Sequence, residues 1–82
     1  MKQILYFTSS WCQPCKMLSP TMESLRGQIN YNKIDVDSGS DLIVKYKIRS
    51  VPTLVLVENG VEITRMSGNA SPQSILEFYK SK

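Results

Sequence analysis

The two cysteines of this chain, Cys12 and Cys15, are separated by two residues in the segment WCQPCK, which covers residues 11–16. The 82 residues contain no other cysteine and no histidine. A pair of thiols at this spacing can open and close as a redox couple, supply two ligands to a metal ion, or form a permanent disulfide. The surrounding residues allow these three possibilities to be weighed against one another.

A metal site is poorly supported by the residues available. A closed zinc site needs four ligands, and Cys12 and Cys15 would supply only two of them. Carboxylates or a second chain would have to supply the rest, so we expect no metal. Thiol–disulfide exchange needs no organic cofactor, so we expect none. A permanent disulfide is also disfavoured, because it would close a loop of only a few residues and remove little entropy from the unfolded chain. The redox couple is the favoured interpretation.

The segments around the cysteines predict how the first thiol is positioned. Residues 3–8 have the apolar, β-branched and aromatic character of a short buried strand, and a helical pattern follows over about 12–27. Cys12 thus falls at the N-terminus of a helix, where unpaired backbone N–H groups and the helix dipole stabilise a thiolate. Lys16, one turn on, adds a positive charge of the same effect. Cys15 lies on the same face, close enough for a disulfide after a small adjustment of the first turn.

The other residues of the segment suit the start of a helix. Pro14 is tolerated there because the first N–H groups of a helix have no intrahelical partner. Trp11, beside the two thiols, offers a flat apolar surface to a partner chain. Further along, Pro20 removes one helical hydrogen bond and predicts a bend, and Gly27 is the expected stop.

The remaining segments predict a mixed α/β domain. Residues 30–36 form a second candidate strand, and residues 37–48 form a short helix that Ser38 or Ser40 caps. Two apolar runs then flank the Asn-Gly pair at residues 59–60, which is the favoured pair for a tight antiparallel hairpin.

The last segment predicts a helix in which Ser71 is the N-cap and Pro72 the first residue. Its buried face is expected to contain Ile75, Leu76, Phe78 and Tyr79. The complete order is βαβαββα, with the first two strands parallel and the last two antiparallel. We therefore predict a single domain over residues 1–82, with a mixed four-stranded sheet and helices on both of its faces.

Charge and composition argue against several kinds of partner. The net charge is +3, and the basic residues are scattered apart from a small cluster over 45–49. A nucleic-acid-binding surface needs a denser basic stripe with interleaved aromatic residues, so we expect no nucleic-acid partner. We recognise no signal peptide and no stretch of membrane-spanning length, so we expect no membrane association. The expected state is a monomer in the cytoplasm, where an isolated CxxC pair is more often catalytic or metal-binding than structural.

The segment WCQPCK resembles the active-site motif of thioredoxins, which has glycine where this chain has Gln13. The likeness covers essentially the whole chain and includes Pro20, KIDVD at 33–37, KYKIRSVPT at 45–53, ENG at 58–60 and Gly68. It implies a minimal thioredoxin-like fold of glutaredoxin size, which begins at the family's central strand and lacks the family's extra N-terminal strand and helix.

The resemblance implies a thiol–disulfide oxidoreductase that reduces disulfides in substrate proteins. Cys12 would attack the substrate disulfide as the nucleophile, and Cys15 would then resolve the mixed disulfide and leave a Cys12–Cys15 disulfide. A reductase similar to thioredoxin reductase would return the electrons. The resemblance also implies a cis peptide bond before Pro52. The substrate groove that it implies is formed by Trp11, Val51, Pro52, Gly68 and Asn69.

Two positions depart from the family pattern. Thioredoxins usually carry a buried carboxylate six residues before the first cysteine, and this chain has Tyr6 there. The resemblance then leaves Lys33, which matches the family's partner lysine, or water to assist Cys15. The second departure is Gln13, which lies between the cysteines, where residues tune the reduction potential; we expect a reducing potential.

Two alternative functions remain open on the sequence. The size also suits a glutaredoxin-like enzyme that works with glutathione, although Trp11 and the pattern of residues 11–16 favour the thioredoxin branch. A thioredoxin fold can also serve as a non-catalytic binding module. Both cysteines and Lys16 are present, however, which argues against a loss of the chemistry.

Overall fold

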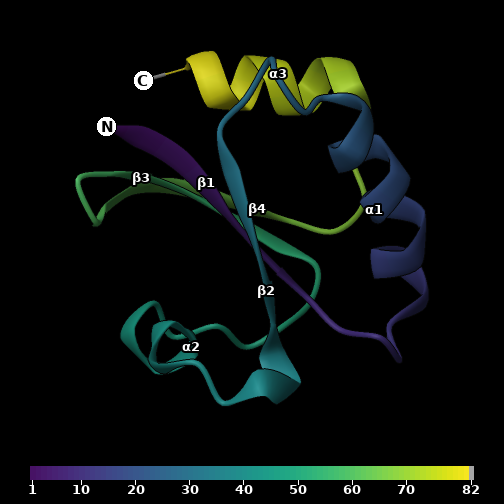
Figure 1. The fold of residues 1–82 in the computed structure, drawn as a ribbon, viewed down its shortest axis with the longest axis vertical. Helices are drawn as coiled ribbons and strands as arrows, with labels where there is room; N and C mark the ends of the chain where they lie inside the picture. Colours follow the sequence, from purple (N-terminus) through teal and green to yellow (C-terminus); the bar gives the residue numbers. More distant parts are fainter. Residues whose placement is uncertain (82) are drawn as a thin grey trace.

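The fold is built on a mixed four-stranded sheet, seen in a computed structural model that describes residues 1–81 (Figure 1). The strands, which lie in the order β2-β1-β3-β4, are β1 (Lys2–Thr8), β2 (Tyr31–Asp35), β3 (Thr53–Glu58) and β4 (Val61–Ser67). The helical elements are α1 (Gln13–Ser24), the 3-10 turn η1 (Val36–Ser38), α2 (Asp41–Lys45) and α3 (Pro72–Lys80). The predicted order βαβαββα is confirmed, with η1 added between β2 and α2.

The pairing of the strands also agrees with the prediction. β1 pairs in parallel with β2 and antiparallel with β3. β3 and β4 form the antiparallel hairpin that the sequence predicts. Its turn residues Asn59 and Gly60 have φ values of 53° and 83°, and a tight two-residue hairpin turn requires such positive values.

Alternating side chains of β1 contribute to a core on each face of the sheet. Ile4 and Tyr6 lie in the core with residues of α1 and α3, whereas Leu5 and Phe7 lie in the core on the α2 side. The helical segments supply Leu18, Met22 and Ile75 to the first core and Leu42, Ile43 and Tyr46 to the second. The sheet therefore has helices on both faces, as predicted, and its central strand is buried.

The extent of α1 differs from the prediction. The helix begins after its N-cap Cys12, runs through Pro20 and ends at Ser24. Gly27, the expected stop, lies outside the helix in the following turn. The backbone N–H of Leu25 bonds to the carbonyl three residues earlier at 3.1 Å, so the chain tightens into a 3-10 turn before it reaches the glycine.

The caps of the other two helices agree with the sequence. Of the two candidate serines, Ser40 caps α2, and its hydroxyl accepts a backbone N–H of the first turn at 3.2 Å. Ser71 caps α3, and Pro72 is its first residue. On the predicted buried face of α3, Ile75 is fully buried, whereas Leu76, Phe78 and Tyr79 are partly buried.

None of the helices described is a candidate membrane span. The longest of the three α-helices, α1, has 12 residues. Across residues 1–81, no helix is both long enough and apolar enough to cross a bilayer.

Candidate active site

Cys12 is the N-cap of α1, at the end of the loop that leaves β1. Its backbone is extended (φ −95°, ψ 117°), and its sulfur accepts a hydrogen bond from the backbone N–H of Cys15 at 3.3 Å. The Cys12 thiol in turn donates to the carbonyl oxygen of Val51 at 3.6 Å. A sulfur thus takes the place of the usual capping oxygen, at the end of the helix where the dipole favours negative charge.

The two thiols are free and differ in their environments. Cys12 is 6% exposed, whereas Cys15 is 1% exposed. Burial raises the pKa of the Cys15 thiol above its ordinary value, and the hydrogen bond with Cys12 acts in the same direction. Hydrogen bonds from the Thr8 hydroxyl and the Ser9 backbone oppose this rise in the pKa of Cys15.

A polar contact holds Trp11 against the 3-10 turn. The indole Nε1 donates to Oδ2 of Asp37 at 2.9 Å, and the Ser9 hydroxyl donates to the same oxygen at 3.3 Å. The Trp11 ring remains 67% exposed and lines a groove with Cys12. Sequence reasoning gave Asp37 no place at the site, because only the fold brings η1 beside the loop that follows β1.

The groove beside Cys12 has a volume of about 380 Å³. Its lining residues are Trp11, Cys12, Val36, Ile43, Ile48, Arg49, Ser50 and Val51. Three of the predicted site residues, Trp11, Cys12 and Val51, therefore lie together. The apolar wall, which comes from η1, α2 and the segment before β3, was missed because apolar residues in these elements read as ordinary core.

Other residues of the predicted groove lie outside this lining. The Val51–Pro52 peptide bond is cis, as the resemblance implies, and Pro52 is buried. The backbone N–H of Gly68 donates to the Pro52 carbonyl at 3.0 Å. The side chain of Asn69 accepts the backbone N–H of Ala70 at 3.0 Å. Of the groove residues described, Pro52, Gly68 and Asn69 do not line the 380 Å³ groove.

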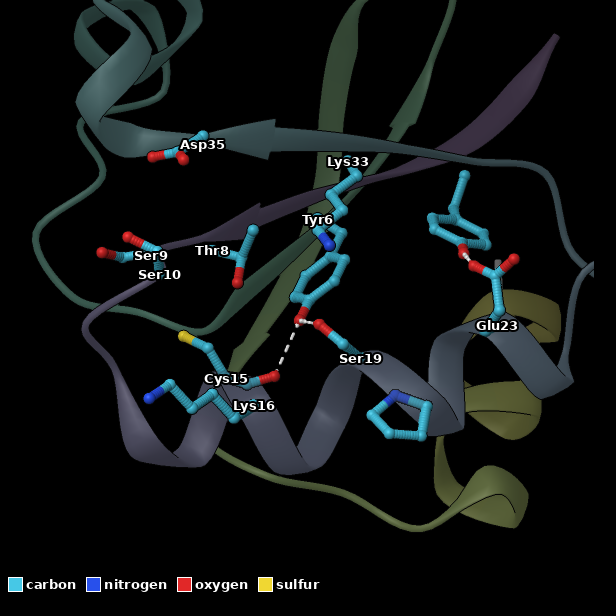
Figure 2. A pocket seen from close by; sticks show the side chains of 12 residues that line it. Tyr6, Thr8, Ser9, Ser10, Cys15, Lys16, Ser19, Glu23, Lys33 and Asp35 are labelled. Carbon is cyan, nitrogen blue, oxygen red and sulfur yellow. Dashed lines mark hydrogen bonds between the residues drawn. The ribbon is translucent and has the colours of Figure 1, made fainter.

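A second, polar cavity of about 540 Å³ reaches Cys15 between β1, β2 and α1 (Figure 2). Its lining residues are Tyr6, Thr8, Ser9, Ser10, Cys15, Lys16, Ser19, Pro20, Glu23, Tyr31, Lys33 and Asp35. Lys16 and Lys33, both singled out from the sequence, line this cavity and not the groove. Gln13 and Pro14 line neither, and both are exposed on the first turn of α1.

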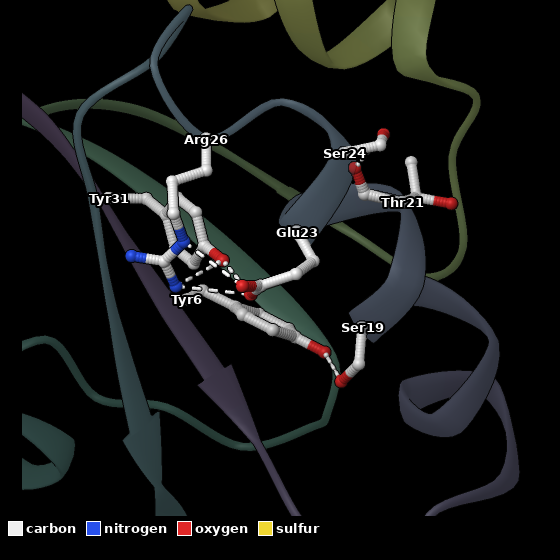
Figure 3. Close-up of polar contacts among 7 residues, drawn as sticks. All are labelled: Tyr6, Ser19, Thr21, Glu23, Ser24, Arg26 and Tyr31. Atoms are coloured by element: carbon white, nitrogen blue, oxygen red, sulfur yellow. Dashed lines mark hydrogen bonds and ion pairs between the residues drawn. The ribbon is translucent and has the colours of Figure 1, made fainter.

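Tyr6, which stands where the resemblance implies a carboxylate, connects β1 to α1. Its hydroxyl donates to the carbonyl oxygen of Cys15 at 3.2 Å and shares a hydrogen bond of 3.0 Å with the Ser19 hydroxyl (Figures 2 and 3). The side chain is 1% exposed and belongs to the core under α1. The phenol therefore anchors the helix through its backbone.

A surface cluster joins the end of α1 to β2 (Figure 3). Arg26 donates two hydrogen bonds to the Glu23 carboxylate, each at 3.0 Å, and the Tyr31 hydroxyl donates to it at 2.9 Å. These bonds, first the one from Arg26, lower the pKa of Glu23. The Glu23 carboxylate, at this edge of the polar cavity, is therefore already hydrogen-bonded to Arg26 and Tyr31.

No candidate metal centre is found in the part of the chain that the structure describes. Residues 1–81 contain no group of three or more His, Cys, Asp or Glu side chains arranged to hold a metal ion.

Comparisons with known proteins agree with this fold. The thioredoxin family model matches residues 1–81. Thioredoxin-2 of Saccharomyces cerevisiae is 39% identical to this chain over 81 residues, which cover 95% of this chain and 77% of the yeast protein. Thioredoxin of Chlamydia trachomatis is 34% identical over 78 residues, which cover 92% of this chain and 76% of that protein.

Solved structures give the same result. Thioredoxin-2 of a malaria parasite superposes with a TM-score of 0.88 at 29% identity, covering 100% of this chain and 84% of the parasite chain. A mutant thioredoxin of Halobacterium salinarum superposes with a TM-score of 0.88 at 34% identity, covering 98% of this chain and 73% of that one.

The fold and the paired thiols together define a thiol–disulfide oxidoreductase with a CxxC pair. The chain belongs to the thioredoxin family. Membership of this family brings with it, in general terms, substrates that contain disulfides and a reductase that supplies electrons.

Removal of the Tyr6 hydroxyl should weaken the attachment of α1. In Tyr6→Phe, the Cys15 carbonyl and the Ser19 hydroxyl lose a partner, so we expect the free energy of unfolding to fall by about 1–2 kcal/mol. Tyr31→Phe is the matched control, because it removes two exposed hydrogen bonds and should cost less than about 0.5 kcal/mol. Urea denaturation followed by circular dichroism measures both losses. Equal losses in the two variants would contradict the anchoring role of Tyr6.

The stability of the reduced protein should fall at alkaline pH. Because the pKa of Cys15 is raised in the folded state, the unfolded chain is the first to lose this proton as the pH rises. The contribution of the Cys15 thiol to stability is complete below the ordinary thiol pKa of 9.0. It is lost as the pH rises through the raised pKa that this thiol has in the folded protein. Urea denaturation from about pH 8 to about pH 10 should therefore show a steeper loss of stability for wild type than for Cys15→Ser. Parallel curves would contradict the expectation.

Proposed function

We propose that this protein reduces disulfide bonds in other proteins, with Cys12 as the nucleophile and Cys15 as the resolving thiol. The observation that carries the proposal is the asymmetry of the pair. The Cys12 sulfur lines the groove and accepts the N–H of Cys15 at 3.3 Å, whereas Cys15 is 1% exposed. A substrate disulfide can therefore approach the first sulfur more readily than the second.

The reaction proceeds by two exchanges. The Cys12 thiolate attacks one sulfur of the substrate disulfide, and the other substrate sulfur leaves as a thiolate. The backbone N–H of Cys15 donates to the Cys12 sulfur at 3.3 Å, and a hydrogen bond of this kind is stronger to an ionised acceptor than to a neutral one. Cys15 then attacks Cys12, which forms the Cys12–Cys15 disulfide and releases the second substrate sulfur. Two electrons have passed from the dithiol to the substrate.

The residues that line the groove indicate which class of substrate it would bind. Val36, Ile43 and Ile48 form an apolar wall beside Cys12, and Arg49 places a positive charge on the same lining. We propose that the groove takes an extended segment with an apolar side chain beside its reacting cysteine and an acidic residue nearby. The Val51 backbone is proposed to pair with that segment, and Pro52, Gly68 and Asn69 to support it from the neighbouring turns.

The oxidised protein requires a partner that returns electrons. We propose a reductase similar to thioredoxin reductase that approaches through Trp11 and the groove, because the Cys12 sulfur is reached from this side. We further propose a monomer that acts in the cytoplasm, where thiols are kept reduced. A reducing potential is proposed for the pair, set in part by Gln13 and Pro14 on the first turn.

Insulin reduction tests the proposed activity and the roles of the two thiols. The wild type should accelerate the reduction of insulin by dithiothreitol, and Cys12→Ser should be inactive. Cys15→Ser should form a covalent adduct with the substrate that mass spectrometry detects and that added thiol releases. Turnover by Cys15→Ser at the wild-type rate would contradict the resolving role.

Faster reduction of the oxidised protein by glutathione than by thioredoxin reductase would favour the glutaredoxin-like alternative, and complete inactivity would favour a binding module.

Reversal of the charge at Arg49 should change the choice of substrate. Two peptide disulfides that differ only in Glu or Lys beside the cysteine are compared by kcat/KM. In Arg49→Glu, the ratio should move toward the Lys peptide by about fivefold to tenfold, as expected of one exposed charge pair replaced by a repulsive one. Lys80→Glu makes the same change of net charge on α3 and should leave the ratio unchanged. An unchanged ratio in Arg49→Glu would show that Arg49 does not select substrates.

A further inference from the structure

The polar cavity that reaches Cys15 is rich in hydroxyl groups. Thr8 and Ser9 come from the end of β1 and the start of the loop, and Ser19 comes from α1 (Figure 2). A cavity of about 540 Å³ that is lined by such groups has room and partners for water. The groove on which substrates are proposed to dock has a separate lining, in which Cys15 takes no part.

The proposed cycle places a specific demand on Cys15. A thiolate attacks a disulfide and a thiol does not, so Cys15 must lose its proton before it can resolve the mixed disulfide. Burial raises the pKa of this thiol and so opposes the loss. The Tyr6 hydroxyl, at the position of the family's carboxylate, is already bonded to the Cys15 carbonyl and to Ser19.

Thr8 is the side chain placed to meet this demand. It lies on the same side of β1 as Tyr6, is 5% exposed, and points its hydroxyl toward the Cys15 sulfur (Figure 2). The Thr8 hydroxyl and the Ser9 backbone both act to lower the pKa of the Cys15 thiol, against the rise that burial causes. A hydroxyl that donates to a sulfur favours the thiolate, because the bond is stronger to the charged form.

We propose that Thr8 is a positioning residue for resolution: its hydroxyl, with the Ser9 N–H, holds the Cys15 thiolate while water in the polar cavity accepts the proton. The inference rests on the proposed roles of the two cysteines. In the step itself, the Cys15 thiolate forms a bond to the Cys12 sulfur, and the bond between Cys12 and the substrate sulfur breaks. The substrate leaves as a thiolate with the bonding electron pair, and the Cys15 proton has passed to water.

The charged and titratable groups that share the cavity lining with Cys15 are Tyr6, Lys16, Glu23, Tyr31, Lys33 and Asp35, and Cys12 lies beside it. The carboxylates of Glu23 and Asp35 already accept hydrogen bonds from groups other than Cys15. Glu23 accepts from Arg26 and Tyr31, and Asp35 accepts the backbone N–H of Asp37 at 2.8 Å. Burial, Cys12, Thr8 and Ser9 act on the pKa of Cys15, so the two lysines are given no part in holding its thiolate.

A chromogenic aromatic disulfide used in a single turnover tests the inference. The first equivalent of aromatic thiolate reports attack by Cys12, and the second reports attack by Cys15 on the mixed disulfide. The rate of the second phase is measured against pH for wild type, Thr8→Val and Thr8→Ser. Ser10→Ala is the matched control, because it removes another hydroxyl from the same cavity lining.

In Thr8→Val, the pH midpoint of the second phase should rise by about one unit, and the phase should slow about tenfold at neutral pH. The first phase should be unchanged, and Thr8→Ser and Ser10→Ala should keep the wild-type midpoint. A purely structural role of Thr8 would lower stability without moving this midpoint. Thr8→Ala carries the same expectation as Thr8→Val if the valine variant does not fold.

A wild-type midpoint in Thr8→Val and Thr8→Ala would overturn the inference. It would also be overturned if Asp35→Asn, but not Thr8→Val, slowed the second phase, because a carboxylate would then accept the proton. Either outcome leaves the roles of the cysteines intact. A wild type that released no second equivalent would overturn those roles, and the inference with them.

Discussion

The site depends on the point where β1 ends and α1 begins. The residues of β1 from Ile4 to Phe7 are buried and contribute to the cores on both faces of the sheet. A shift of the strand by one residue would exchange its two faces, so the strand has one stable register. The loop that follows therefore starts from a defined place, and it delivers Cys12 to the N-cap of α1. The remaining features of the site are arranged around that sulfur.

The same helix start makes the two thiols unequal. The N-cap position leaves the Cys12 sulfur at the end of the helix, where it meets a backbone N–H and a groove. The first turn then carries Cys15 inward, toward the core that Tyr6 anchors. One geometric element thus places one sulfur at the edge of a groove and the other further inside, and two-step disulfide exchange uses such a difference between the thiols.

The sulfurs of Cys12 and Cys15 also border two separate cavities. The groove at Cys12 is built by η1, α2 and the segment that precedes β3, with an apolar wall and one arginine. The cavity at Cys15 is built by β1, β2 and α1, with hydroxyl groups, lysines and two carboxylates that are engaged elsewhere. The two cavities share no lining residue, so the surroundings of the two sulfurs can be changed separately by substitution.

The sequence by itself determined the features that arise within a few residues. The hairpin turn at 59–60, the cap Ser71 with Pro72, and the thiol pair at the start of a helix all depend on local backbone preferences. Gly27 is not the end of α1, because the chain tightens into a 3-10 turn at Leu25, before the glycine.

Only the tertiary structure decided how the pair is surrounded. Trp11 and Asp37 are 26 residues apart in sequence, and Cys12 and Val51 are 39 apart. The first contact exists because β1 and β2 pair in parallel with Thr8 opposite Asp35, which sets η1 beside the loop that holds Trp11. Such contacts depend on strand register and on packing between distant segments. Neither can be predicted from a local pattern in the sequence.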